Sequence, residues 1–200
     1  MDNDDSFGIN VLRYTITSSD FSLPSMGQFT MDDTWNDYDL SHVSLSNAEH
    51  YQIPILLDIL AINPDLRLIA SPWTALPWLK TSNSAIGGAL KDDDQTYQTY
   101  GRFFAKLLSL YKSKYDISFF GLTLQNEPLL SPGNYPGTYM SSGQQIRLLA
   151  AAGPAIAEVD GNVKIMVWDF NWNNPQCAID VLSSEAGKQY AAGTAWHCYG

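Results

Sequence analysis

Five apolar segments alternate along the chain with segments of helical periodicity. The apolar segments are rich in β-branched and aromatic residues, which favour strands. Strands are predicted over residues 11–17, 66–73, 117–125, 163–169 and 193–200. The third segment, ISFFGLTLQ, is almost uniformly apolar, which is typical of a strand buried on both faces of a parallel sheet.

Four helices are predicted between these strands. The first starts at Ile53, from which apolar residues follow at i+3, i+4 and i+7, and Pro54 suits its first turn. The second follows Asp92–Asp94, whose negative charges suit a helix N-terminus. The third and fourth are predicted near 141–159 and near 175–190.

The alternation of strands and helices predicts parallel βαβ units and therefore the α/β class. An open doubly wound sheet and a TIM barrel both fit this order. The barrel is favoured, because no glycine-rich phosphate loop follows a predicted strand. A (β/α)8 TIM barrel has eight strands and about 250 residues, so the sequence predicts an incomplete barrel over residues 1–200.

Polar or aromatic residues stand at the carboxyl end of every predicted strand. They are Asp20, Trp73, Asn126 with Glu127, Asp169, and His197 with Tyr199. In a TIM barrel these strand ends open onto one mouth, which carries the active site. We therefore expect these side chains to lie close together.

The composition is that of a globular domain with few charges. Hydrophobic residues make up 45% and charged residues 16%, so the chain is not disordered. The 21 acidic residues exceed the 11 basic ones and give a net charge of -10, which argues against nucleic acid or an anionic membrane surface as partner. Most of the six Trp and eleven Tyr are expected to fill the core, but such rings also suit the apolar faces of sugars.

Targeting segments, membrane spans and metal sites are not expected. The N-terminal segment MDNDDSFGIN has no apolar run, so no signal peptide is predicted in this chain. The longest apolar stretch, IPILLDILAI, is too short to span a bilayer and is interrupted by Asp58, so no stable membrane insertion is expected. Cys177 and Cys198 lie in no metal-ligand pattern and are expected to be two unpaired structural thiols.

Glu127 is the main candidate for chemistry. A carboxyl group at the end of a buried strand is partly desolvated, which raises its pKa and lets it keep a proton near neutrality. A glycosidic oxygen needs such a proton donor to leave as an alcohol. Asn126 points to the opposite side unless the backbone kinks, and Pro128 favours a kink. The alternative is a solvated or salt-bridged loop carboxylate.

Several motifs together resemble family 30 of the glycoside hydrolases, which includes the lysosomal-type glucosylceramidases. GLTLQNEP resembles the fourth-strand motif of that family. VLRYTITSSDFS, IASPWTALPWLKT, VKIMVWDFNW and GTAWHCYG are similar to its second, third, fifth and sixth strands, and GGALKDDDQTYQTYGRFFAKLLSLYK to a helix. The similarity extends over residues 8–200.

The resemblance implies a TIM-barrel catalytic domain, no cofactor and a β-glucoside or glycolipid substrate. Glu127 would be the general acid/base, Asn126 would bind the sugar 2-hydroxyl, and Arg13 would support the carboxylates. Asp20 and Trp73 would bind the glycone. The mouth would be lined by Tyr135, Asp169, Trp196, His197 and Tyr199.

Each supporting residue has a structural alternative. Arg13 is then an ion-pair partner inside the barrel, and the two Trp residues only pack. Asp169 then caps the following helix. For His197, a hydrogen-bonded supporting role is favoured over proton transfer.

The family also uses a second glutamate, at the end of strand seven, as nucleophile, and this chain stops after strand six. A glucosylceramidase is the first interpretation and an endo-β-1,6-glucanase of the same family the second. The third is a catalytically inactive carbohydrate-binding fragment. The resemblance implies an extracellular or lysosome-like location for the full-length protein.

Overall fold

The computed structural model describes residues 8–23, 25 and 27–199. The acidic segment at residues 1–7, used above to argue against a signal peptide, lies outside the described residues. One parallel sheet runs in chain order from β1 to β5. The strands are β1 (Val11–Thr15), β2 (Arg67–Ser71), β3 (Gly121–Thr123), β4 (Lys164–Phe170) and β5 (Ala191–Trp196).

The connections between strands are mostly helical. The helices are α1 (Ser46–Tyr51), α2 (Ile53–Ile62), the 3-10 turn η2 (Pro77–Leu79), α3 (Asp94–Tyr115), α4 (Ser142–Asp160), α5 (Pro175–Ser183) and α6 (Glu185–Tyr190). The N-terminal charge predicted for the second helix is confirmed, because the Asp93 side chain accepts from the Thr96 N–H and caps α3.

Several predicted boundaries are wrong, including that of the strand predicted over 193–200, which ends at Trp196. The helix predicted over 175–190 is two helices, because Ser184 is extended and its hydroxyl accepts from the Gly187 N–H to cap α6. The strand predicted over 117–125 spans only β3. Phe119 precedes β3, and its ring packs against Tyr14 and Tyr111, so its apolar character reflects packing rather than strand pairing.

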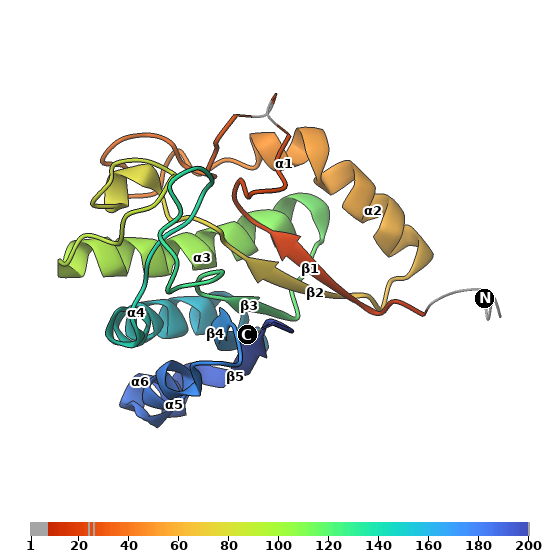
Figure 1. Ribbon diagram of the computed structural model, residues 1–200. Coiled ribbons are helices and arrows are strands. Elements are labelled where there is room, and N and C mark those ends of the chain that lie inside the picture. The colour runs from red at the N-terminus through yellow and green to blue at the C-terminus, as the bar shows by residue number, and fades with distance from the viewer. Residues whose placement is uncertain (1–7, 24, 26, 200) are drawn as a thin grey trace.

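The order of the strands decides between the two architectures left open by the sequence. Consecutive strands are neighbours throughout the sheet, whereas a doubly wound sheet reverses its strand order at a switch point. Figure 1 shows the strands side by side in that order, with α3 and α4 packed alongside each other. The fold is therefore part of a (β/α)8 barrel, and the prediction of that class is confirmed.

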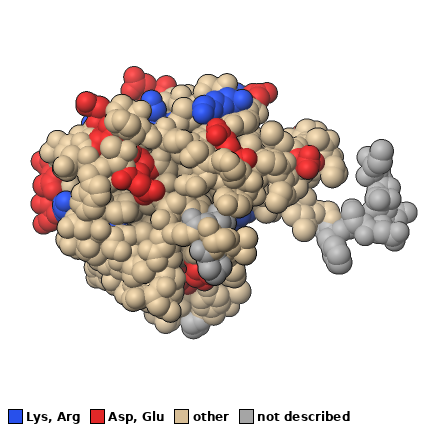
Figure 2. Space-filling model, turned by 90° about the horizontal axis from the view of Figure 1, so that it is seen from above, with Lys and Arg blue, Asp and Glu red and all other residues tan. Residues whose placement is uncertain are grey.

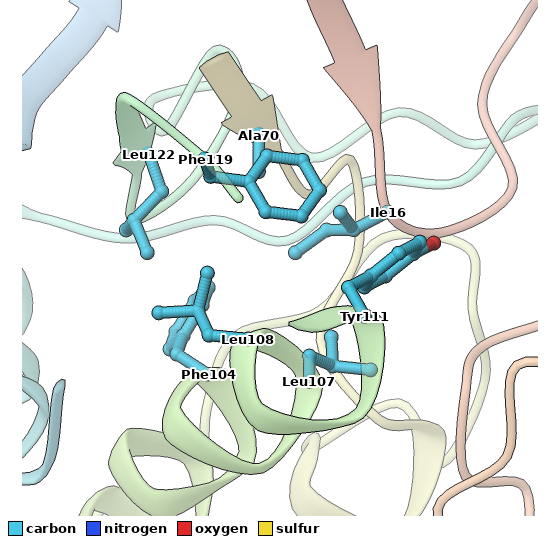
Figure 3. A pocket seen from close by; sticks show the side chains of 8 residues that line it. All are labelled: Ile16, Ala70, Phe104, Leu107, Leu108, Tyr111, Phe119 and Leu122. Carbon is cyan, nitrogen blue, oxygen red and sulfur yellow. The ribbon is translucent and has the colours of Figure 1, made fainter. Parts of the chain in front are cut away.

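The hydrophobic core lies between the outer face of the sheet and α3. Ala70 on β2 and Leu122 on β3 face Phe104, Leu107 and Leu108 of α3 across a cavity of only about 10 Å³, as Figure 3 shows. Burial of each such side chain contributes about 1.5–3 kcal/mol. This packing holds the strands in place and so fixes the positions of their carboxyl ends.

The inner face of the sheet carries the side chains that alternate with those of the core. Arg13, Ile69, Thr123, Met166 and Ala195 point to this side and line a cavity of about 150 Å³. The inner face thus combines the polar Arg13 and Thr123 with the apolar Ile69, Met166 and Ala195.

Acidic side chains outnumber basic ones on the face seen in Figure 2. Asp and Glu lie mainly along its left and upper parts, with smaller groups of Lys and Arg among them, and its lower part is mostly uncharged. Among the described residues, no helix combines the length and the apolarity that a transmembrane segment needs.

Candidate active site

Backbone kinks at the ends of β3 and β4 turn the candidate residues into the mouth of the barrel. Glu127, Trp168 and Asp169 have φ of 47°, 77° and 57°, in the left-handed region that non-glycine residues rarely adopt. Such strain is worth about 1–3 kcal/mol per residue and is concentrated at functional sites. The Glu127 N–H donates to the Asp169 carbonyl at 3.0 Å. The backbone therefore kinks at Glu127, which is the condition for Asn126 and Glu127 to line the same pocket.

Arg13 on β1 connects the ends of three strands. Its Nη2 donates to Asn126 Oδ1 and to Asp169 Oδ2, both at 2.7 Å. The Thr123 hydroxyl donates to the same Asp169 oxygen at 2.6 Å. The Asp169 side chain is only 3% exposed, and a buried carboxylate needs such partners to stay charged.

His197, just past β5, joins Asp169 to Glu127. Its Nε2 lies 3.2 Å from Asp169 Oδ1 and its Nδ1 lies 3.2 Å from Glu127 Oε1. The Tyr199 hydroxyl donates to the same Glu127 oxygen at 3.3 Å. The Glu127 side chain is 18% exposed, so it is neither a buried core group nor a fully solvated one. The interpretation of Glu127 as a solvated loop carboxylate is therefore not favoured.

Three groups contact the imidazole ring of His197. Asp169, an acceptor when ionised, makes Nε2 the donor nitrogen of the ring. Nδ1 faces both Glu127 Oε1 and the Tyr199 hydroxyl, each at 3.2 Å. Glu127 therefore lies next to two groups that exchange protons, which suits a general acid/base.

Asp20 and Trp73 form the opposite wall of the site. The Trp73 Nε1–H donates to Asp20 Oδ1 at 2.8 Å, and the Arg13 guanidinium lies 4.7 Å from the centre of the Trp73 ring. Tyr135 lines a pocket with Trp73 and Glu127. Partial burial, and then the negative charges of Glu127 and Asp20, raise the pKa of the Tyr135 hydroxyl, so this ring stands near both carboxylates.

The structure also tests the expectations for Asp169 as a helix cap and for the two cysteines. Asp169 does not cap the following helix, because the N-cap of α5 is Asn174. The two cysteines are unpaired as expected, but Cys198 is exposed rather than packed. In the described part of the chain, no three His, Cys, Asp or Glu side chains are grouped to hold a metal ion.

Three residues of the site region were missed by the sequence analysis. Thr123 orients Asp169, and its signal is a polar residue within an apolar strand. Lys80 is fully buried and donates to Thr74 Oγ1 and to the Ala85 and Gly137 carbonyls at 2.8–2.9 Å. These hydrogen bonds connect the loop after β2 to the loop after β3. Burial lowers the pKa of the Lys80 side chain to about 7. The third, Trp172, stacks on Trp196.

Asp169 is expected to make stability depend on pH. Burial opposes its ionisation, but hydrogen bonds from His197, Arg13 and Thr123 outweigh burial and lower the pKa of the carboxyl. A pKa below the unfolded value of about 3.9 gives stability that is fully present above that pH and is lost as the pH falls through the folded value.

Asp169→Asn in the complete protein should therefore reduce the slope of unfolding free energy against pH below about pH 4. Denaturant unfolding at several acidic pH values measures that slope. Asp58→Asn, at an exposed carboxyl of α2, is the control and should leave the slope nearly unchanged. An unaltered slope in Asp169→Asn would contradict the lowered pKa of the Asp169 carboxyl group.

Comparisons with known proteins identify the family of the chain. The sequence matches the family model described as "Glycosyl hydrolase family 30 TIM-barrel domain" over residues 2–200. "Putative glucosylceramidase 1" of Caenorhabditis elegans is 32% identical over 98% of this chain and 39% of its own length. "Lysosomal acid glucosylceramidase" of Mus musculus is 33% identical over 95% of this chain and 38% of its own length.

A solved structure extends the similarity to the backbone. An endo-beta1,6-glucanase superposes with a TM-score of 0.87 at 33% identity, covering 98% of this chain and 45% of its own. The chain thus spans about two fifths of the length of the curated relatives it matches. It belongs to glycosyl hydrolase family 30 and forms part of a TIM-barrel domain of that family.

Proposed function

We propose that the complete protein is a retaining β-glycoside hydrolase in which Glu127 is the general acid/base. The contact between Glu127 Oε1 and His197 Nδ1, at 3.2 Å, carries this proposal. It places the carboxyl group next to a ring that exchanges protons, beside a pocket lined by Trp73, Asn126 and Tyr135. In the first step Glu127 gives a proton to the leaving oxygen, and in the second it takes a proton from water.

The other residues bind and orient. The side-chain oxygen of Asn126, Oδ1, accepts a hydrogen bond from Arg13. The side-chain N–H groups of Asn126 are then left to donate to a sugar 2-hydroxyl. Asp20, held by Trp73, has its second oxygen available to accept from glycone hydroxyls. Arg13 orients Asp169, Asp169 orients His197, and His197 positions Glu127. The remaining lining residues, as proposed from the sequence, are Trp196 and Tyr199.

The nucleophile is proposed to come from sequence outside these 200 residues. A retaining mechanism needs a second carboxylate about 5–5.5 Å from the first. Asp169 is occupied by Arg13, Thr123 and His197, and Asp20 by Trp73. Both carboxylates therefore serve binding and orientation, and residues 1–200 are part of a larger catalytic domain.

Glucosylceramide is the first candidate substrate, and the two glucosylceramidase relatives support it. β-1,6-Glucan is the second, supported by the similarity to the endo-beta1,6-glucanase structure. The mouse relative also supports a lysosome-like location.

The test is hydrolysis by the complete protein. Wild-type protein and Glu127→Gln are incubated with glucosylceramide in detergent micelles and with β-1,6-glucan, and the released glucose or oligosaccharide is measured. We expect one substrate to be cleaved, with retention of anomeric configuration. Cleavage of neither, or inversion at the anomeric carbon, would contradict the proposal.

A further inference from the structure

Trp172, in the loop after β4, and Trp196, the last residue of β5, form an aromatic platform. The two indole rings are parallel, with an interplanar angle of 6° and centroids 4.8 Å apart. Trp172 is 57% exposed. Because Trp196 covers one face of the Trp172 ring, that exposure leaves the other face open to a ligand.

Hydrogen bonds and a ring contact fix the position of the platform. Trp196 donates through Nε1 to Thr194 Oγ1 at 2.7 Å, and its ring meets the edge of buried Trp168. The Trp168 Nε1–H in turn donates to the Asn171 carbonyl at 3.1 Å, which anchors the backbone next to Trp172. A ring that is fixed before binding loses little conformational entropy when a ligand stacks on it.

The platform adjoins the proposed catalytic site. Trp196 lines the same cavity as Arg13, Asp169 and His197, and His197 contacts Glu127. The left-handed residues Trp168 and Asp169 direct both the buried carboxylate and the Trp172 loop. The strain that positions Asp169 therefore also positions the platform.

The neighbours of the exposed ring indicate a sugar rather than an acyl chain. Asn173, next to Trp172 in the sequence, is exposed, so an amide group adjoins the open ring. A pyranose presents an apolar face for the ring and hydroxyls around its rim for an amide. An acyl chain would leave that amide without a partner when it displaced water.

We propose that Trp172 is a stacking platform for a second pyranose ring, next to the glucosyl unit cleaved at Glu127. The inference rests on the proposed function and favours β-1,6-glucan over glucosylceramide as its substrate. Trp172 thereby acts in specificity and takes no part in proton transfer.

The experiment compares variants of the complete protein on two substrates. β-1,6-Linked glucose oligosaccharides have a second ring, whereas β-glucosyl fluoride has none. Trp172→Ala should lower kcat/KM for the oligosaccharides about tenfold, the upper part of the range for an aromatic stacking contact, mainly through KM. Trp172→Phe should lose less, and neither variant should change the hydrolysis of β-glucosyl fluoride.

The matched control is Phe120→Ala, an exposed aromatic at the opposite, amino end of the strands, which should change neither substrate. The platform would be overturned if Trp172→Ala lowered kcat/KM equally for both substrates, or did not lower it for the oligosaccharides. It would also be overturned if the variant lowered only the hydrolysis of glucosylceramide in micelles.

Failure of the proposed function gives a different result. If wild-type protein hydrolyses no β-glucoside, binding of the same oligosaccharides is measured instead, by the quenching of tryptophan fluorescence. Weaker binding in Trp172→Ala by about tenfold then still supports the platform, whereas no quenching in wild-type protein overturns it.

Discussion

Glu127→Gln in the complete protein is expected to lower kcat/KM for β-glucosides with poor leaving groups by about 10²–10⁴-fold. Glutamine keeps the shape of the side chain and can still face His197 and Tyr199, but it has no proton to give to the leaving oxygen. Substrates with activated leaving groups need no protonation, so their kcat/KM should change little.

The second half of the reaction gives an independent readout. Without a base, attack of water on the glycosyl–enzyme intermediate is slow, and kcat should fall even for activated substrates. Azide needs no base to attack, so adding it should restore turnover. Glu158→Gln, at an exposed carboxyl of α4, is the control. Equal losses of kcat/KM for poor and activated leaving groups would show that Glu127 is not the acid/base.

The 200-residue chain expressed by itself is expected to hydrolyse β-glucosides several orders of magnitude more slowly than a complete family enzyme. The chemical reason is that the nucleophile is proposed to lie outside these 200 residues, and removal of one member of a catalytic set abolishes most of the acceleration. The structural reason is that β1 and β5 are unpaired edges of an unclosed barrel, whose inner face carries apolar side chains such as Ile69 and Met166.

An activated aryl β-glucoside is the appropriate substrate, since it does not need Glu127 as acid. Circular dichroism and size-exclusion chromatography establish whether the chain is folded in the assay. Turnover near that of a complete enzyme, abolished by Asp20→Asn or Asp169→Asn, would show that the nucleophile is misassigned. Sugar binding without turnover would instead favour a carbohydrate-binding fragment.

The local pattern of residues was sufficient to predict the class of fold. Strands could be placed because a strand buried on both faces is apolar over its whole length, as around Leu122, and helices because their apolar residues recur with the helical period, as around Leu107. Polar residues that follow such strands, including Glu127 and Asp169, must lie at the carboxyl end of a parallel sheet. The candidate site was therefore predictable as a group of residues.

The contacts within that group were decided by tertiary structure. Arg13 and Asp169 are 156 positions apart, and no local period indicates that they pair, so Asp169 could equally have capped a helix. The burial of Lys80 and the stacking of Trp172 on Trp196 likewise depend on loops that meet only in the folded chain. Periodicity reports which face of an element is buried, whereas hydrogen bonds and ring stacking depend on ångström-scale positions set by packing between distant segments. The sequence by itself thus determined the α/β class and the residues at the carboxyl ends of the strands, and the fold decided for the barrel over the open sheet and fixed which partner each residue holds.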